Sequence, residues 1–155
     1  MFSKSTFLKL FLIILCFTLA GKVVMAQPQV EVIIKNDAQV SPNIYEFDVY
    51  LVSTGSTPFE MSLHQYGLNY NSAIKNGGTL TASWVSGTTE INPAQLQNIL
   101  NTTSNPSQIR IASRAAPGAG NGTQIPLSPG KRVGRLRMTN SVAFAAVSPN
   151  IAFSP

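Results

Sequence analysis

The chain has 155 residues, of which only 11% are charged, and its 11 basic and 6 acidic side chains give a net charge of +5. It contains one cysteine and one histidine, which excludes an intrachain disulfide and argues against a zinc site built from thiolates and imidazoles. The scarcity of charge, together with 11 glycines and 10 prolines, favours an extracellular β-protein over a cytosolic helical one.

Residues 1–26 have the pattern of a secretory signal peptide. A lysine-bearing start precedes the apolar run LFLIILCFTL. Val24 and Ala26 then provide small residues at the −3 and −1 positions of a cleavage site that we expect between Ala26 and Gln27. A transmembrane helix needs about 20 apolar residues, so an uncleaved anchor is the weaker alternative. We expect a protein that is secreted or held at the cell surface and that meets the membrane only through this segment before cleavage. The mature part is expected to be a single domain at 27–155.

Cleavage changes the charge balance of the chain. It removes three lysines and Cys16, so eight basic side chains remain against six acidic ones, a net charge of +2. A net charge this small does not support a nucleic-acid partner. Without a cysteine, the mature domain must be stabilised by packing alone, and its 129 residues are enough for one hydrophobic core.

Alternating apolar and polar residues predict β-strands along the mature chain. We expect strands at 30–35, 44–52, 59–71 (with a bulge), 79–85, 108–114 and 131–138, and a last extended piece at about 142–153. Turns are expected at Asn36-Asp37 and Asn76-Gly77-Gly78. The clearest strand, IYEFDVYLV, separates into an inner face with Tyr45, Phe47, Val49 and Leu51 and an outer face with Glu46, Asp48 and Tyr50.

The same period of two predicts further inner positions, at Leu68, Ile109, Ile111, Leu136 and Met138. Trp84 shares a face with Leu80. For this reason we expect Trp84 in the core rather than on a platform that stacks against sugar rings.

One segment, INPAQLQNILN at 91–101, predicts a helix of about two turns. Asn92 is suited to cap it, Pro93 to its first position, and Gln95 to a capping box. Leu96 begins a helical spacing of apolar residues. Seven or eight strands with one short helix indicate an all-β fold, an antiparallel β-sandwich.

The glycine-rich stretch between Arg114 and Met138 raises the question of a nucleotide site. Its glycines at 118, 120 and 122 miss the spacing of a dinucleotide fingerprint, and Ile125 stands where a P-loop needs glycine. Prolines at 126 and 129 prevent the helix that would present its amides to a phosphate. We therefore expect a long loop between strands and no cofactor.

The titratable residues give no clear catalytic set. His64 is expected to be partly buried with a hydrogen-bonded ring, because no nucleophile motif accompanies it. Glu46 and Asp48 lie about 6.5–7 Å apart on one strand face, a separation that overlaps the one in inverting glycosidases. Those enzymes place their carboxylates across a cleft, so we expect a solvated face and no enzyme. A calcium site that adds Asp37 is a weak alternative.

The arginines alternate with inner residues in two strands. If these strands pair, Arg110, Arg114, Arg135 and Arg137 share one outer sheet face, where like charges repel and would mark an anionic partner. Tyr50 is the aromatic side chain expected on the outer surface. These five are the candidate ligand-binding residues. The alternative is a solvated basic face that serves solubility.

The segments IYEFDVYL, HQYGLNYNSAIKNGGTL, SQIRIASR and GKRVGRLRM resemble cohesin-like modules, which share a jelly-roll-type sandwich with cellulose-binding families two and three. A cohesin strand typically contains aromatic-Gln-Phe-x-Leu-x-Tyr-Asp-Pro, and residues 66–71, YGLNYN, stand in its place. STGSTPFEM, NGGTL and PGAGNG are similar to N-terminal modules of large surface proteins exported by the type IX system. The resemblance covers about residues 28–153.

The resemblance implies a secreted, non-catalytic binding or adhesion module that recognises a polysaccharide or a partner protein. The alternatives are a structural spacer without a ligand and an accessory module of a glycoside hydrolase. Three departures stand out. Asn71-Ser72 replaces the usual Asp-Pro, the row of outer aromatic residues of a cellulose binder is missing, and no sorting domain follows Ser154-Pro155. The last departure leads us to expect a truncated reading frame or a stand-alone module.

Overall fold

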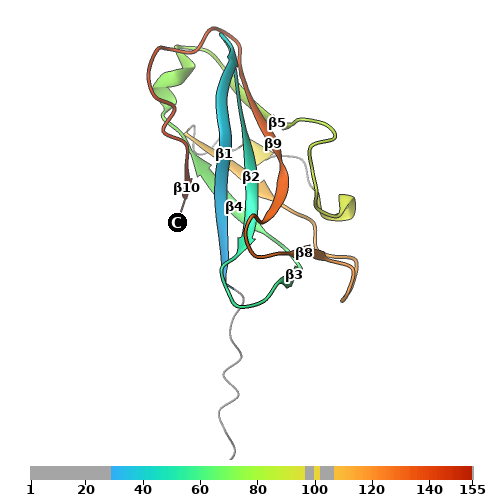
Figure 1. Ribbon diagram of the computed structural model, residues 1–155. Coiled ribbons are helices and arrows are strands. Elements are labelled where there is room, and N and C mark those ends of the chain that lie inside the picture. The colour runs from blue at the N-terminus through green and yellow to red at the C-terminus, as the bar shows by residue number, and fades with distance from the viewer. Residues whose placement is uncertain (1–28, 97–99, 102–106, 155) are drawn as a thin grey trace, which may run out of the picture.

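The computed structural model describes residues 29–96, 100–101 and 107–154. They form two four-stranded antiparallel sheets and a two-stranded ribbon (Figure 1). The first sheet has the order β1-β2-β9-β5, the second has the order β10-β4-β7-β6, and the ribbon pairs β3 with β8. The predicted signal peptide, with its cleavage point between Ala26 and Gln27, lies outside the described residues.

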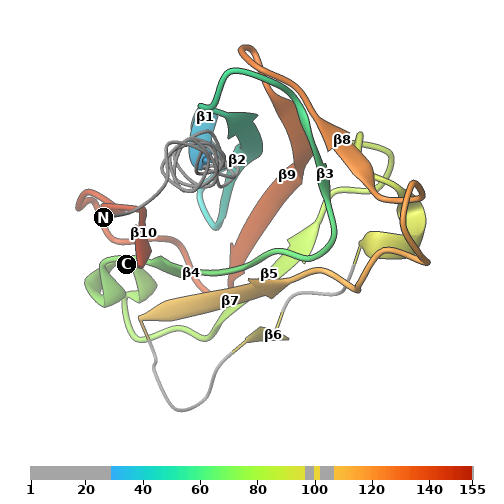
Figure 2. The same cartoon turned by 90° about the horizontal axis from the view of Figure 1, so that it is seen from below.

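The two sheets lie in separate layers, with the ribbon at one side (Figure 2). The first sheet consists of β1 (Val30–Ser41), β2 (Ile44–Ser53), β9 (Lys131–Asn140) and β5 (Leu80–Trp84). The second consists of β10 (Ala152–Ser154), β4 (Gln65–Asn69), β7 (Gln108–Ala112) and β6 (Leu100–Asn101). The ribbon is β3 (Phe59–Met61) and β8 (Thr123–Ile125), and two 3-10 turns are η1 (Ser72–Lys75) and η2 (Pro93–Gln95). The predicted all-β antiparallel sandwich is confirmed.

Apolar side chains from both sheets meet between the layers. The side chains at the centre of this hydrophobic core are each at most 2% exposed. They are Phe47, Val49, Leu51, Leu136 and Met138 from the first sheet, and Leu68, Ile109 and Ile111 from the second. Burying each such side chain stabilises the fold by about 1.5–3 kcal/mol. The predicted period of two is confirmed at all these positions.

Trp84 packs against this core from β5 and is half-buried. A Cβ atom at Gly134 would lie 2.9 Å from Cε3 of the indole, so the missing side chain of this glycine makes room for the ring. Trp84 therefore contacts the core, as predicted, although it is only partly buried.

β1 does not end at Asn36-Asp37, where a turn was predicted. Lys35 pairs with Asp48, but the next pair is Ala38 with Glu46, so two residues of β1 oppose one residue of β2. This is a β-bulge, and Asn36 accommodates it with a left-handed φ of 54°, a conformation that asparagine tolerates better than most residues. The strand therefore continues to Ser41.

The single long strand predicted at 59–71 is also wrong. β3 pairs with β8 in the ribbon, whereas β4 pairs with β7 and β10 in the second sheet. Between β3 and β4, the carbonyl of Ser62 accepts a hydrogen bond from the amide of Ala116, and the carbonyl of His64 accepts one from the amide of Ser113. These bonds hold the chain where it passes from the ribbon to the second sheet. In the piece predicted as extended at 142–153, β10 begins only at Ala152.

The predicted two-turn helix at 91–101 is reduced to the 3-10 turn η2. The cap is confirmed, because Asn92 Oδ1 accepts from the amide of Ala94 at 3.0 Å. However, Leu96 has an extended backbone, and Leu100 belongs to strand β6. Residues 97–99 lie outside the described part of the chain.

The side chain of Gln95 accounts for this difference. It is fully buried and joins three segments. Its Nε2 donates to the carbonyl of Met61 at 2.8 Å, and its Oε1 accepts from both the amide and the hydroxyl of Thr123, each at 2.8 Å. These bonds satisfy groups that would otherwise be buried without partners. The Gln95 carbonyl also accepts from the amide of Arg114 at 2.8 Å, so it is not available for a helical hydrogen bond.

Replacing Gln95 by alanine should therefore destabilise the domain by about 3 kcal/mol, since buried groups of Met61 and Thr123 lose their partners and a cavity forms. The free energy of unfolding from urea denaturation measures the effect. Gln124→Ala is the matched control, because Gln124 is exposed on the neighbouring strand β8 and should change stability by less than about 0.5 kcal/mol. Equal effects of the two variants would contradict this role for Gln95.

Candidate functional site

The four arginines predicted to share one face do not do so. Arg110 lies on β7 and Arg135 and Arg137 lie on β9, and these strands belong to different sheets. β9 pairs with β2 and β5, and β7 pairs with β4 and β6, so neither has an edge left for the other. Arg114 is exposed beyond the end of β7.

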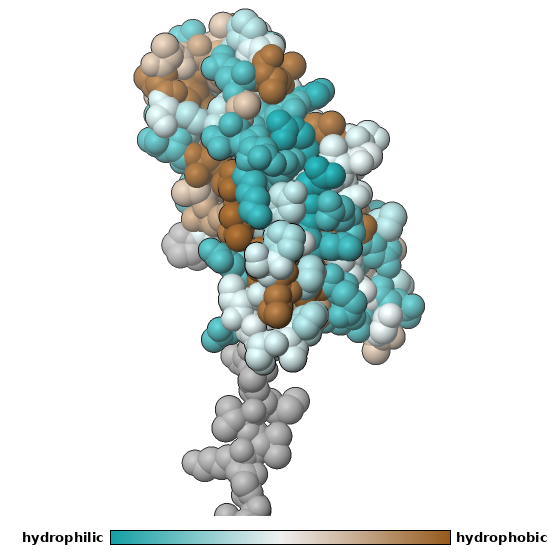
Figure 3. Space-filling model, viewed as in Figure 1, coloured by the Kyte–Doolittle hydropathy of each residue, from teal (hydrophilic) through white to brown (hydrophobic). Residues whose placement is uncertain are grey.

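Arg135 and Arg137 form an ion-pair cluster with Glu46 and Asp48 on the outer face of the first sheet. Arg135 Nε lies 2.6 Å from Glu46 Oε2, Arg137 Nε lies 2.7 Å from Glu46 Oε1, and Arg135 Nη1 lies 3.3 Å from Asp48 Oδ1. The β2–β9 register explains the contacts, because it sets Glu46 opposite Arg137 and Asp48 opposite Arg135. Hydrophilic side chains gather over this face (Figure 3).

The carboxylates of this cluster are buried, so the solvated face predicted for them is wrong. Glu46 is 7% and Asp48 is 3% exposed, and Asn36 Nδ2 donates to Asp48 Oδ2 at 2.8 Å. The hydrogen bond from Arg135 holds the pKa of Glu46 below its usual value against the opposing effect of burial. The cations around both carboxylates are arginine side chains, which is unfavourable for a calcium site and for an acid catalyst.

Two further candidate residues, Tyr50 and Asp37, are engaged by neighbours. Lys35 Nζ lies 4.6 Å from the centre of the Tyr50 ring, a cation–π contact. Asp37, the third residue of the weak calcium set, accepts a hydrogen bond from the Tyr45 hydroxyl at 2.5 Å. Burial and this hydrogen bond raise the pKa of Tyr45 to about 12.

His64 is partly buried, as predicted. Its ring stacks on Tyr66 with centroids 5.4 Å apart, and its Nδ1 lies 3.1 Å from Met61 Sδ. Burial lowers the pKa of His64 to about 4, so the ring is neutral at physiological pH. The buried hydroxyl of Tyr66 has no hydrogen-bond partner among the described residues.

The glycine-rich stretch forms the predicted loop, together with the short strand β8 that was not foreseen. The amides of Gly120 and Gly122 donate to the two carboxylate oxygens of Glu60, at 3.0 and 2.6 Å. The loop amides thus hold an anion, but the anion is a side chain of the protein itself. Gly120 has a φ of 80°, which favours glycine.

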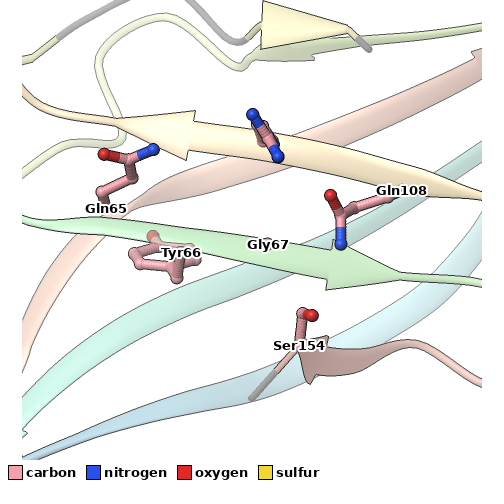
Figure 4. A pocket seen from close by; sticks show the side chains of 6 residues that line it. Gln65, Tyr66, Gly67, Gln108 and Ser154 are labelled. Carbon is pink, nitrogen blue, oxygen red and sulfur yellow. The ribbon is translucent and has the colours of Figure 1, made fainter. Parts of the chain in front are cut away.

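A polar hollow lies on the outer face of the second sheet (Figure 4). We name it the Gly67 hollow, with a volume of about 450 Å³ and a lining of Gln65, Tyr66, Gly67, Gln108, Arg110 and Ser154. These residues come from β4, β7 and β10. The alternation in β4 and β7 places Leu68 and Ile109 inside and directs Gly67 and Arg110 outward.

The strand register creates this hollow. Gly67 pairs with Ser154 on one side and with Arg110 on the other, so a hydroxyl and a guanidinium flank a position without a side chain. A Cβ atom at Gly67 would lie 2.9 Å from Gln108 Nε2 and 3.1 Å from Ser154 Cβ. The Gln108 carboxamide and the Ser154 side chain therefore lie directly over the Gly67 backbone, an arrangement that leaves no room for a side chain at this position.

The lining offers hydrogen-bond donors and acceptors rather than reactive groups. Gln65 and Gln108 carry amides, and Gln108 Nε2 donates to Asn69 Oδ1 at 3.0 Å, which orients it. Arg110 is exposed and makes no ion pair within the described residues. Such a surface is suited to holding a polar ligand.

Sequence reasoning identified Arg110 but missed the other polar lining residues. Gly67 inside a strand was the one local signal, because such a glycine often marks a close approach of a ligand or another backbone. Arg114, Arg135, Arg137 and Tyr50 do not line the Gly67 hollow.

The chain matches no family model, no curated protein and no solved structure. The resemblance to cohesin-like modules therefore stays a prediction. None of the helical segments in the described part of the chain has the length and apolar character needed to cross a membrane.

We expect Glu46→Gln to lower the free energy of unfolding at neutral pH by about 2 kcal/mol, since charge-assisted hydrogen bonds from Arg135 and Arg137 are weakened. The folded-state pKa of Glu46 is lowered, so its contribution is present above the usual value of 4.5 and is lost as the pH falls through the folded-state value. The difference between wild type and variant should shrink over this acidic range in urea denaturation series.

Glu31→Gln is the control, because Glu31 is exposed on β1 and forms no ion pair in the described structure. A Glu46→Gln difference that stays constant down to the lowest pH would show that the ion pairs are not its source.

The Glu60→Gln variant should loosen the glycine-rich loop, because an amide side chain has one carbonyl oxygen where the carboxylate has two acceptors. Hydrogen exchange at the amides of Gly120 and Gly122 should become about tenfold faster. Exchange at Val49, in the core of β2, serves as the internal reference and should not change. Unaltered exchange at both glycines would argue against the Glu60 contact.

Proposed function

We propose that this chain is a secreted, non-catalytic module that binds polysaccharide at a cell surface through the Gly67 hollow. The observation that carries the proposal is the polar hollow built where Ser154, Gly67 and Arg110 are paired across three strands. Neighbouring strands lie about 4.8 Å apart. The backbones of the outer two of these strands are therefore about 10 Å apart across the Gly67 hollow, which is wide enough for an extended ligand.

The chemistry of the lining favours a ligand rich in hydroxyl groups. A sugar hydroxyl both donates and accepts hydrogen bonds, and the amides of Gln65 and Gln108 do the same. The volume of about 450 Å³ falls within the range of small-ligand sites, about 300–1,000 Å³. Such sites are usually mostly apolar, whereas side chains of this lining other than Tyr66 are polar, which suits a hydrophilic ligand.

The absence of catalysis is supported by the state of the titratable residues. Glu46 and Asp48, the carboxylate pair that a glycosidase would need, are buried in ion pairs. His64 is neutral at physiological pH and stacks on Tyr66. Export is supported by the sequence of residues 1–26, and adhesion by the resemblance to modules of surface proteins.

The experiment measures retention of the mature domain on a panel of neutral and acidic polysaccharides in affinity gels. Gln65→Ala combined with Gln108→Ala should weaken retention about tenfold, because two hydrogen-bonding groups are lost. Gln29→Ala combined with Gln124→Ala is the matched control, since both glutamines are exposed and neither lines the hollow. It should bind as the wild type does.

Two results would overturn the proposal. Equal retention of the hollow variant and the wild type would place the binding surface elsewhere on the domain. No retention of the wild type on any polysaccharide would favour a spacer module without a ligand of its own.

A further inference from the structure

We infer that the Gly67 hollow recognises the carboxylate of an acidic polysaccharide, with Arg110 as the side chain that binds it. The inference rests on the proposed function and names its substrate class. It begins from the distribution of positive charge in the described structure.

The arginines of the first sheet are neutralised within the protein. Arg135 and Arg137 pair with Glu46, and Arg132 Nε lies 3.7 Å from Glu90 Oε1. Their positive charges are therefore paired with carboxylates of the protein itself. Arg110 differs, because no ion pair or side-chain hydrogen bond engages it within the described residues, and it is exposed on the second sheet.

The position of Arg110 directs this free charge into the hollow. Its register partner on β4 is Gly67, and side chains at paired positions of antiparallel strands lie side by side on one face. Arg110 lines the hollow together with Gly67 and Gln108, and the Gln108 carboxamide lies over the Gly67 backbone. Ser154 pairs with Gly67 from the other side, so its hydroxyl faces the same space.

Among the described residues, no acidic side chain lines the hollow to compete with a ligand. A carboxylate bound in the hollow would meet a lining that includes the guanidinium of Arg110, the hydroxyl of Ser154 and the amide of Gln108, all of which can donate hydrogen bonds. Charge-assisted bonds of this kind are about twice as strong as neutral ones. A neutral sugar in the same position would use only the neutral donors.

The lining also favours a polysaccharide over an acidic peptide as the source of the carboxylate. Protein partners usually bury an apolar centre, and apart from Tyr66 no lining residue has an apolar side chain. The hydroxyl groups of a uronic acid form hydrogen bonds with the amides of Gln65 and Gln108 in this arrangement, while its carboxylate binds Arg110.

The test compares polygalacturonate with the same polymer after methyl esterification, which removes the charge and keeps the sugar. The wild-type mature domain should bind the free acid about tenfold more tightly than the ester, and added salt should reduce the preference. Arg110→Gln should bind both polymers as the wild type binds the ester. Arg114→Gln is the matched control, because Arg114 is exposed and outside the hollow, and it should keep the full preference.

The possible outcomes separate this inference from the proposed function. Equal binding of acid and ester, still weakened by Gln65→Ala with Gln108→Ala, would overturn the carboxylate inference and leave polysaccharide binding standing. An acid preference that survives in Arg110→Gln would assign the carboxylate to another residue and overturn the inference. Failure to bind this pair and every polymer of the panel would overturn both. A thermal unfolding curve checks that each variant is folded.

Discussion

The pairing of carboxylates on β2 with guanidinium groups on β9 is the interaction on which the sandwich depends. β2 lies in the middle of its sheet and buries both of its faces, the inner one with Phe47 and the outer one with Glu46 and Asp48. A buried carboxylate without a partner would cost several kcal/mol, so burial of the outer face requires Arg135 and Arg137 at the neighbouring positions. The charges on β2 are therefore complementary to those on β9, one of its two neighbouring strands.

The inward and outward directions of the side chains could be predicted from the sequence, because alternation is a local property. Phe47, Leu136 and Ile111 were all placed correctly by a period of two. The identity of neighbouring strands could not be predicted in the same way. Arg110 and Arg135 each alternate with inner residues of their own strand, yet their strands belong to different sheets, and only pairing between distant segments decides this.

Where the predictions failed, a tertiary contact had replaced a local preference. Asn92 and Pro93 start a helical turn as expected, but the buried bonds of Gln95 to Met61 and Thr123 end it. The Gly67 hollow was hidden for a related reason. Ser154 on β10 and Arg110 on β7 both pair with Gly67 on β4. The hollow therefore forms where three segments that are distant in sequence meet at a residue without a side chain.

That absence makes the surface easy to change during evolution. A single nucleotide substitution in a glycine codon can introduce alanine, serine, aspartate or another residue. At position 67 the new Cβ atom would press mainly on the flexible end of Gln108 and on Ser154, and the backbone is not among the positive-φ glycines. One codon can therefore fill the Gly67 hollow or reverse its charge while the sandwich beneath it persists, so the surface chemistry of this face can change without a change of fold.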